Sequence, residues 1–329
     1  MAPKARIYRG TPRNLAFLAR RLRAGELVAV PTETVYGLAG DATSRRACRA
    51  IFAAKGRPAN DPLIVHLARA SDLGRVAVAS PEARVLARAF WPGPLTLVLA
   101  KTPAVPDAAT SGLPSVAVRV PSHPLLRRLI RLCGLPLAAP SANPFGYVSP
   151  TTAEHVRSGL GSRIRHILDG GPASIGLEST IVDLRRPGRP VLLRPGAITR
   201  AQLARALGVP VRTATRAGAG GRAHVAPGQM RRHYSPRTPV VLHARLGAWG
   251  APDEAWLYLR RPARRAGASL PGNVFWLDER GDLRRAARRL FAVLRRIDQG
   301  GYRRIHAELP SGEGLAEAIA DRLSRAASR

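Results

Sequence analysis

The chain has 329 residues, a length that suggests two domains, and its 53 lysines and arginines against 21 aspartates and glutamates give a formal net charge of +32. No apolar run approaches the ~20 residues that span a bilayer and no apolar leader is visible, so we expect a cytoplasmic protein with no membrane partner. Cys48 and Cys133 have no neighbour at disulfide or metal spacing, so neither a disulfide nor a zinc site is indicated.

Short apolar strands alternate with amphipathic helices over the first part of the chain. Residues 11–25 predict a helix with Thr11 as N-cap, a proline at its first position and leucines along one face. Residues 44–56 predict a second helix, with Ser44 as N-cap and Gly56 just past its end. Further helices are predicted at 80–90 and 123–134, and strands at 26–30, 63–67, 95–100, 115–120, 135–140, 179–184 and 190–195. This alternation predicts an α/β domain with a largely buried sheet over residues 1–208.

The pattern changes after residue 208. Residues 209–238 are rich in glycine and small side chains and have no period, which is typical of a linker or a functional loop. Strands are then predicted at 239–244, 255–260, 273–277 and 303–309, and helices at 282–298 and 314–327, so residues 239–329 predict a small second α/β domain. The arginines of the helix at 282–298 fall mostly away from its apolar stripe, and we expect a solvated face at Arg284, Arg285, Arg288, Arg289, Arg295 and Arg296.

The lysine at position 55 is unusual in this chain. Apart from Lys4 and Lys101, every other basic residue is arginine, and a compact ammonium is not interchangeable with a guanidinium at a phosphate or a small anion. Lys55 also stands at the end of a predicted helix, where any cation complements the helix dipole. Position alone therefore leaves two interpretations of Lys55 open, an anion-binding cation and an exposed helix-end charge.

Seven segments rich in hydroxyls, prolines or charges follow one another along the chain. They contain neither a Walker loop nor a GxGxxG fingerprint. They are PTETVYGL (31–38), KGRPANDPLIVHL (55–67), WPGPLTLVL (91–99), VAVRVPSHP (116–124), APSANPFGYVSPT (139–151), GLESTIVDL (176–184) and LLRPGAI (192–198). Together and in this order they resemble the YrdC-like threonylcarbamoyl-AMP synthase family, and PGQMRRHYSP (227–236) with the domain that follows resembles its two-domain branch.

The resemblance implies a fold and a reaction. The fold would be α/β, with a YrdC-like twisted open mixed sheet followed by a smaller Rossmann-like α/β domain. The enzyme would be a nucleotidyltransferase, an L-threonylcarbamoyladenylate synthase that joins L-threonine, bicarbonate or carbon dioxide, and ATP to give threonylcarbamoyl-AMP and pyrophosphate. The product would serve N6-threonylcarbamoyladenosine (t6A) formation at tRNA position 37 through a downstream tRNA threonylcarbamoyl transferase complex. Mg²⁺ would accompany ATP, and no metal ligands in the protein are assigned.

The resemblance also assigns site residues. Lys55 and Arg57 would be catalytic, because they would neutralise carbonate, carbamate and triphosphate groups that otherwise repel one another. The L-threonine pocket would be formed by Thr32, Thr34, Tyr36, His66, Arg119, Ala139 and Ser179, with Arg119 on the substrate carboxylate. ATP would be held by Arg57, Asn60, Asp61, Ser115, Ser141, Asn143, Ser149, Arg194, His233 and Tyr234.

Several alternatives remain open at the level of individual residues. His66 could be a satisfied histidine in a buried strand, and Arg119 could point to solvent from an edge strand. Phe145 stands where the family usually has a small hydroxyl residue, so its ring would either narrow the nucleotide pocket or pack outward. We expect residues 227–236 to fold over the pocket as a lid. The alternative is a linker whose aromatic and basic residues pin the two domains together.

Two other function classes compete. The positive charge is compatible with an RNA-binding translation or ribosome-maturation factor of the same fold without catalysis, since basic side chains facing phosphates release counterions. Against this, the arginine excess accompanies an alanine excess and is spread along the chain, so much of it is expected to be solvated surface. The carbamoyl-adenylate enzymes of hydrogenase maturation share the domain, but they carry cysteine-rich fingers, and two isolated cysteines argue against that class.

Overall fold

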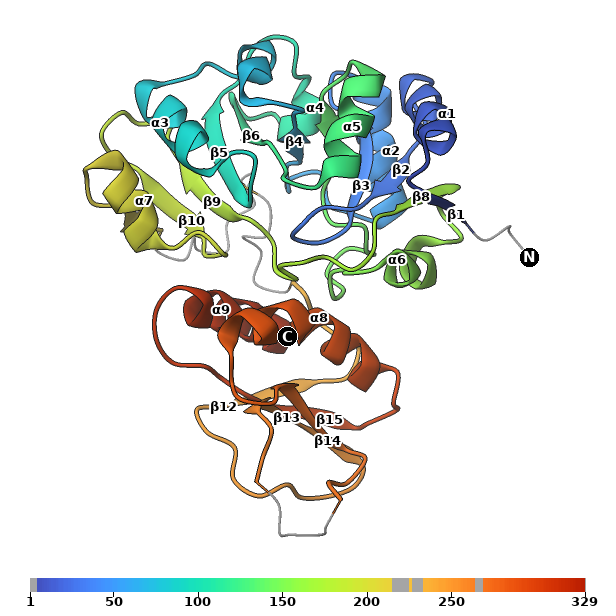
Figure 1. The fold of residues 1–329 in the computed structure, drawn as a ribbon, viewed down its shortest axis with the longest axis vertical. Helices are drawn as coiled ribbons and strands as arrows, with labels where there is room; N and C mark the ends of the chain where they lie inside the picture. Colours follow the sequence, from blue (N-terminus) through green and yellow to red (C-terminus); the bar gives the residue numbers. More distant parts are fainter. Residues whose placement is uncertain (1–4, 215–224, 227–232, 264–268, 329) are drawn as a thin grey trace.

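The computed structural model describes residues 5–214, 225–226, 233–263 and 269–328. A larger part holds the first eleven strands, and a smaller part below it holds the last four (Figure 1).

The larger part is built on one mixed sheet with the strand order β1-β8-β2-β3-β7-β4-β6-β5-β9-β10-β11. Strands β4 and β6 pair in parallel and place His66 beside Arg119, whereas β2–β3 and β5–β6 are antiparallel. This confirms the predicted mixed sheet. The strands are β1 (Arg6–Arg9), β2 (Val28–Val30), β3 (Gly37–Asp41), β4 (Ile64–His66), β5 (Leu95–Ala100), β6 (Ser115–Arg119), β7 (Leu137–Ala138), β8 (His166–Asp169), β9 (Thr180–Asp183), β10 (Val191–Arg194) and β11 (Arg212–Thr213).

The helices of the larger part begin and end where local chemistry predicts. Thr11 Oγ1 accepts the Asn14 amide at 3.3 Å and caps the first helix, and Ser44 Oγ accepts the Ala47 amide at 3.2 Å and caps the second. Gly56, with φ +64°, ends the second helix. The helices are α1 (Pro12–Arg23), α2 (Arg45–Lys55), α3 (Pro81–Phe90), α4 (Asp107–Thr110), α5 (Pro124–Cys133), α6 (Ala153–Leu160) and α7 (Arg200–Leu207), with a 3₁₀ helix at Ala70–Arg75.

Several elements were not predicted. Strands β1, β3, β8 and β11 and helices α4, α6 and α7 are short, with at most eight residues each. Helices α6 and α7 nevertheless carry end signals that were not read, an N-cap at Thr152 and a capping box formed by Thr199 and Gln202. Strand β3 begins inside the segment PTETVYGL (31–38), where no strand was predicted. Its first residue, Gly37, lies so close to Ala139 that a Cβ there would be 3.2 Å from the alanine methyl group. The strand therefore depends on close approach to β7 and its following loop rather than on β-forming side chains.

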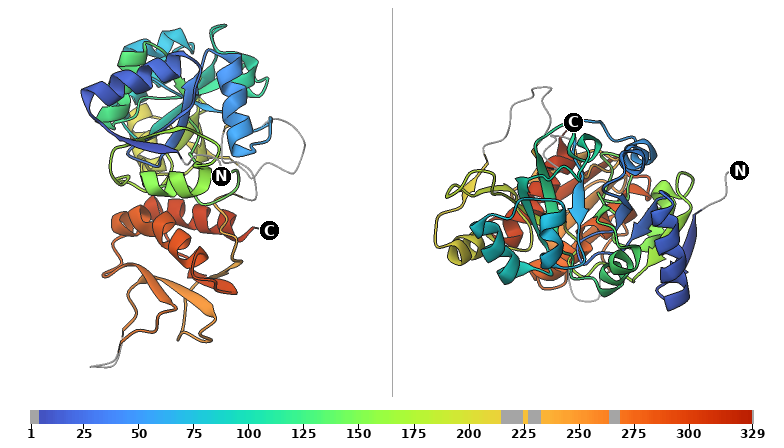
Figure 2. Two further views of the ribbon diagram at one scale, coloured as in Figure 1. Left: turned by 90° about the vertical axis from the view of Figure 1, so that its right-hand side faces the viewer. Right: turned by 90° about the horizontal axis from the view of Figure 1, so that it is seen from above.

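The smaller part has an all-parallel sheet in the order β12-β15-β13-β14, as predicted for a Rossmann-like domain. Its helices lie between this sheet and the larger part in both side views (Figures 1 and 2). The elements are β12 (Val240–His243), β13 (Glu254–Arg260), β14 (Val274–Asp278), α8 (Leu283–Asp298), β15 (Arg304–Glu308) and α9 (Leu315–Ala327).

Helices α8 and α9 share an apolar core with loops of the larger part. Val35, Val148 and Leu177 belong to the same buried cluster as Phe291 and Leu294. Gly176, with φ +80°, approaches the Arg288 backbone so closely that a Cβ would lie 2.4 Å from the Arg288 Cα. The two parts are therefore interlocked through side chains and backbone and not merely tethered.

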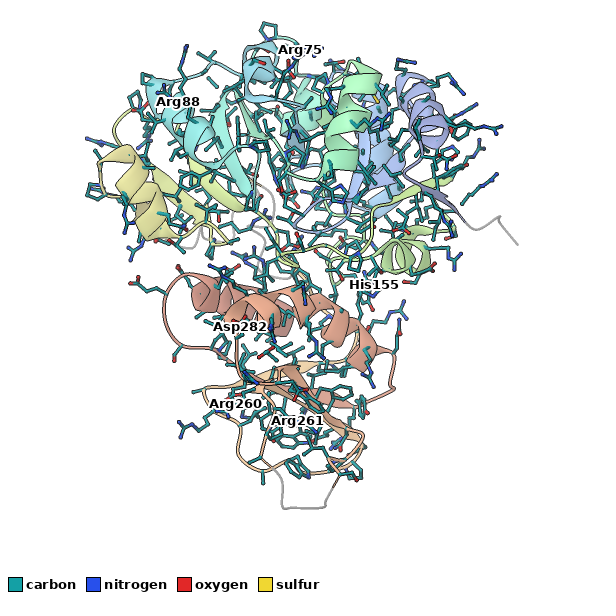
Figure 3. All side chains as sticks on the ribbon, viewed as in Figure 1. Arg75, Arg88, His155, Arg260, Arg261 and Asp282 are labelled. Atoms are coloured by element: carbon teal, nitrogen blue, oxygen red, sulfur yellow. The ribbon has the colours of Figure 1, made fainter. Side chains whose placement is uncertain are left out.

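One buried arginine contradicts the expected solvated face of α8. Arg295 is only 2 % exposed, and its guanidinium donates to the carbonyl oxygens of Val148, at 2.5 Å, and Ser149, at 3.4 Å. The prediction was wrong for this residue because the larger part covers that end of the helix, near His155 (Figure 3). The other arginines of the set, at 284, 285, 288, 289 and 296, are exposed, as expected.

Candidate active site

A pocket lies where loops of the larger sheet meet the segment that leads to the smaller part. The space left between its side chains is about 40 Å³, room for only a few water molecules. Eleven predicted site residues line it, namely Thr32, Thr34, Arg57, His66, Arg119, Ala139, Ser141, Ser179, Arg194, His233 and Tyr234. The others that line it are Val35, Gly37, Ile64, Pro140 and Glu178.

Lys55, at the end of α2, is buried behind this lining and is 2 % exposed. Its ammonium donates to the carbonyl oxygens of Ser141 at 2.5 Å and Asn143 at 2.6 Å. The interpretation of Lys55 as an exposed helix-end charge is therefore wrong. Burial, with the nearby Arg57 charge, holds the pKa of Lys55 well below its usual value. An anion bound beside it would stabilise the ammonium again.

Arg57 is fixed by the loop that follows α2. Its Nε donates to the Asp61 carbonyl at 2.7 Å, and its Nη2 lies 2.9 Å from the Asp61 carboxylate and donates to the Pro62 carbonyl at 2.8 Å. The sequence RPAND thus folds back on its own arginine, and this explains why Asp61 lies behind the pocket. The guanidinium faces the pocket with its orientation set by three oxygens.

Arg119 is also buried, at 3 % exposure, which contradicts the alternative that it points to solvent. Its anion in this structure is Glu33, with Nη2 2.7 Å from Oε1, and its Nη1 donates to Thr34 Oγ1 at 2.8 Å. Thr32 and Thr34 hydroxyls lie 2.7 Å apart, and Thr32 Oγ1 donates to the Val35 carbonyl at 2.6 Å. The PTETV segment is therefore a turn held by hydroxyls that presents both threonines to the pocket.

The electrostatics of this corner keep Glu33 charged and His66 neutral. Burial alone would raise the pKa of Glu33, but Arg119 and the Ser122 amide, which donates to Oε1 at 3.0 Å, hold it below its usual value. Burial, assisted by the Arg119 charge, lowers the pKa of His66 to about 3. The imidazole therefore carries no charge, and its Nδ1 donates to the Ile64 carbonyl at 3.2 Å.

The opposite wall is built from the start of β9 and the end of β10. Arg194 donates from Nε to the Ser179 carbonyl at 3.0 Å and from Nη2 to Ser179 Oγ at 3.1 Å. Ser179 Oγ also lies 2.7 Å from Thr96 Oγ1. Ser149, behind the lining, donates to Glu178 Oε1 at 2.5 Å. The hydrogen bonds of this wall thus form two groups, one around Ser179 and one around Glu178, and the two groups adjoin because these residues are neighbours in the chain.

His233 and Tyr234 close the pocket from the linker side. Their rings meet edge to face at 4.1 Å, and the Tyr234 ring stacks on Phe291 of α8 at 5.5 Å. Tyr234 has φ +62°, a left-handed conformation that is uncommon outside glycine. These two residues both line the pocket and attach to the smaller part. Residues 227–232 of the expected lid lie outside the described residues.

Phe145 is not among the residues that line the pocket, and its ring meets the ring of the lining residue His233 edge to face at 6.1 Å. Of the remaining predicted residues, Tyr36 donates to the Gly171 carbonyl at 2.7 Å, and Asn143 donates to the carbonyls of Pro144 and Tyr147, both at 2.8 Å. These two therefore hold the loops that carry lining residues. Asn60 Oδ1 and Ser115 Oγ are buried without a hydrogen-bond partner among the described residues.

Glu33, Glu178 and Arg322 are the charged groups that the sequence did not assign to the site. Glu33 lies between Thr32 and Thr34 in PTETVYGL, and Glu178 directly precedes Ser179 in GLESTIVDL, so a carboxylate next to hydroxyl residues was the available signal. Arg322 belongs to α9, and nothing in its sequence neighbourhood marks it. The described residues contain no cluster of three or more His, Cys, Asp or Glu side chains that could hold a metal ion.

Counting Lys55 and Arg322 behind the lining, the pocket brings together five cations, the others being Arg57, Arg119 and Arg194. They face four carboxylates, those of Glu33, Asp61 and Glu178 and, on α9, that of Asp321. An excess of fixed positive charge in a site that excludes water suits polyanionic ligands and stabilises negative charge that develops during a reaction. Hydroxyls and carbonyls between the cations could orient an uncharged part of a ligand.

Comparisons with known proteins give relatives of the whole chain. A family model for the Sua5, YciO and YrdC proteins, described as "Telomere recombination", matches residues 20–196, and one described as "Threonylcarbamoyl-AMP synthase, C-terminal domain" matches residues 198–328. The chain is 41 % identical to the threonylcarbamoyl-AMP synthase of Pyrococcus abyssi over 93 % of this chain and 91 % of that protein. For the Bacillus subtilis enzyme of the same name the identity is 40 %, over 95 % and 92 %.

A solved structure shows the same fold over both parts. The crystal structure of P. abyssi Sua5 complexed with L-threonine superposes with a TM-score of 0.87 at 37 % identity and covers 98 % of each chain. Both family models match this chain, and relatives with about 40 % identity cover nearly all of it. The chain belongs to the threonylcarbamoyl-AMP synthase family, in the branch that carries the C-terminal domain.

Proposed function

We infer that this protein makes threonylcarbamoyl-AMP from L-threonine, bicarbonate or carbon dioxide, and ATP, and releases pyrophosphate. The observation that carries the inference is the pocket of buried cations and hydroxyls. It is supported by the solved structure of a relative, P. abyssi Sua5, in complex with L-threonine. The product would supply t6A formation at tRNA position 37, and a downstream tRNA threonylcarbamoyl transferase complex is the proposed recipient.

The reaction requires the pocket to bring anions close together and to exclude water. The amine of threonine forms an N–C bond to carbon dioxide and loses a proton, which gives a carbamate anion. A carbamate oxygen then attacks the α-phosphorus of ATP, the bond from that phosphorus to the bridging oxygen breaks, and pyrophosphate leaves. Anions must therefore meet closely while water is excluded, since water would destroy both carbamate and adenylate.

The residues of the pocket fit these tasks in separate groups. The corner of Thr32, Thr34, His66 and Arg119 is neutral or hydroxyl-rich apart from the Arg119–Glu33 pair, and it suits an amino acid with a hydroxyl side chain. Arg57 and Arg194 lie on the pocket surface and suit the phosphates. Lys55, behind them, would add positive charge where the carbamate and the α-phosphate meet.

Mg²⁺ is proposed as the companion of the triphosphate and not as a resident metal. The described side chains offer no carboxylate cluster for it, so we assign no protein ligands. It would neutralise phosphate charge on ATP. Within the described residues no helix is long and apolar enough to cross a membrane.

The test uses purified protein with ATP, Mg²⁺ and bicarbonate, and either L-threonine, L-serine or no amino acid. Pyrophosphate release and the adenylate product are measured together. Threonine-dependent release, with serine clearly slower, is expected. Equal pyrophosphate release with and without an amino acid would reject the proposal, and an RNA-only protein of this fold would show no threonine-dependent use of ATP.

A further inference from the structure

A carboxylate on the pocket wall is held by an arginine from the other part of the molecule. Arg322, on α9, is completely buried, and its Nε lies 2.9 Å from Glu178 Oε2. Its Nη2 also donates to the Glu178 backbone carbonyl at 3.4 Å. The second oxygen of the same carboxylate accepts the Ser149 hydroxyl at 2.5 Å. Glu178 thus connects α9 to a residue proposed to bind ATP.

Close contacts of α8 with the larger part lie next to both residues that bind through the Glu178 carboxylate; we call this contact region between the two parts the joint. Gly176, two residues before Glu178, touches the backbone of α8 so closely that no side chain fits. Arg295 of α8 holds the carbonyls of Val148 and Ser149. The smaller part therefore holds both loops that meet at the Glu178 carboxylate. Among the described residues, no side chain of the smaller part itself lines the pocket, because the last lining residue along the chain is Tyr234.

The charge of Glu178 would be a difficulty for a site that binds a triphosphate. The residue lines the pocket beside Ser179 and Arg194, so a bare carboxylate there would repel a polyanion in a region of low dielectric. Arg322 supplies the compensating charge from behind. Its guanidinium also lies 5.3 Å from the centre of the Tyr234 ring, the aromatic that closes the pocket.

We propose that Arg322 is a positioning residue of the ATP site, which neutralises Glu178 and orients the Ser149 hydroxyl and the Tyr234 ring for the nucleotide. The smaller part thereby contributes to nucleotide binding without touching the nucleotide. This inference rests on the proposed function, because it takes ATP as the ligand beside Glu178.

The experiment compares four full-length variants with the wild type, namely Arg322→Gln, Glu178→Gln, the double variant, and Arg284→Gln as a control from an exposed position of the smaller part. Pyrophosphate release gives kcat and KM, with ATP varied at saturating threonine and then threonine varied at saturating ATP. Thermal unfolding checks that each variant is folded.

Arg322→Gln should raise KM for ATP about tenfold or more, because it leaves a buried carboxylate facing the triphosphate, with a smaller change in KM for threonine. The double variant should return to within about threefold of the wild type, since two neutral amides can still hydrogen bond. Asp321, which also loses Arg322 as a partner at 2.8 Å, still pairs with Arg325 at 3.0 Å. If the Arg322–Glu178 pair served only to hold the fold together, the double variant would be at least as impaired as Arg322→Gln. Arg284→Gln should match the wild type.

An unchanged KM for ATP in Arg322→Gln, or a double variant as impaired as that single variant, overturns the proposal. If Arg322→Gln does not fold, Glu178→Gln decides, because its more positive pocket should bind ATP at least as well and with a steeper salt dependence. A tenfold rise in KM for ATP there would equally overturn it. A wild type without threonine-dependent pyrophosphate release would count against the proposed function instead.

Discussion

The buried cations of the two parts find their partners in different ways. In the larger part, Arg57 pairs with Asp61 four residues further on, and Arg119 with Glu33 on a neighbouring loop of the same part. In the smaller part, Arg295 and Arg322 both reach across to the larger part, to Val148 and Glu178. The larger part is therefore self-sufficient in pairing its pocket cations, whereas the smaller part uses its buried cations to hold the pocket walls.

The first and largest test of this comparison is Lys55, a pocket cation whose two described hydrogen bonds both go to backbone carbonyls. Lys55→Ala should lower the rate of threonylcarbamoyl-AMP formation by about 10²-fold or more, because a fixed cation near the reacting anions is lost. It should also cost about 1–3 kcal/mol of unfolding free energy, because two buried carbonyls lose their donor. Pyrophosphate release and urea unfolding measure the two effects.

Lys101→Ala is the matched control, because that lysine pairs with Asp107 away from the pocket and its loss should leave turnover near the wild type. Lys55→Arg should also be impaired if a compact ammonium is required. Normal turnover in Lys55→Ala would show that Lys55 has only a structural role. Full activity of Lys55→Arg would show that a compact charge is not required.

The second test breaks the joint itself. Gly176→Ala places a methyl group against the Arg288 backbone, so it should lower the unfolding free energy by about 1–3 kcal/mol more than a matched change elsewhere. Gly188→Ala is that match, since Gly188 has φ +67° and open space around its Cβ position. Urea unfolding of both variants gives the difference. Equal costs would show that the two parts are not interlocked at Gly176.

The third test concerns the acid sensitivity of the pocket. The pKa of His66 is about 3 in the folded protein, while the unfolded chain takes up a proton near the usual histidine value of about 6.5. The unfolded state therefore binds more protons below that pH, and stability is lost as the pH falls from about 6.5 towards 3, by up to about 1.4 kcal/mol per pH unit for this group. His66→Asn should flatten the slope of unfolding free energy between pH 6 and 4.

The range above pH 7 is the internal control for that measurement, because His66 is neutral there in both states. If wild type and His66→Asn lose stability at the same rate between pH 6 and 4, His66 does not remain neutral in the folded pocket.

The smallest effect is expected at a peripheral contact of the joint. Tyr147 donates to the Asp298 carboxylate of α8 at 2.7 Å but lies outside the pocket lining. Tyr147→Phe should cost about 0.5–1.5 kcal/mol of unfolding free energy and leave turnover almost unchanged. Tyr302→Phe, which loses an exposed hydrogen bond within the smaller part, should cost less. A large loss of turnover in Tyr147→Phe would mean that the whole joint, and not the Glu178 contact, controls the site.

Much of the site could be predicted because the relevant residues stand in collinear segments that resemble a known family. Arg57, Thr34, His66, Ser179 and Arg194 were assigned in this way and all line the pocket. The environments of these residues could not be predicted. That Arg119 already has a carboxylate partner in Glu33, and that Lys55 is buried behind two loops, depends on how distant strands meet.

The sequence by itself determined the local structure of this protein. Thr11, Ser44 and Gly56 set helix ends through contacts three or four residues apart, and the leucines of α1 mark its buried face without reference to the rest of the chain. Only the tertiary structure decided strand β3, the burial of Arg295, and the pairing of Arg322 with Glu178, 144 residues away. Strand β3 forms by pairing within the larger part, and the contacts of Arg295 and Arg322 form when the smaller part packs on the larger one. Contacts between residues so far apart leave no periodic signal in the sequence around either partner.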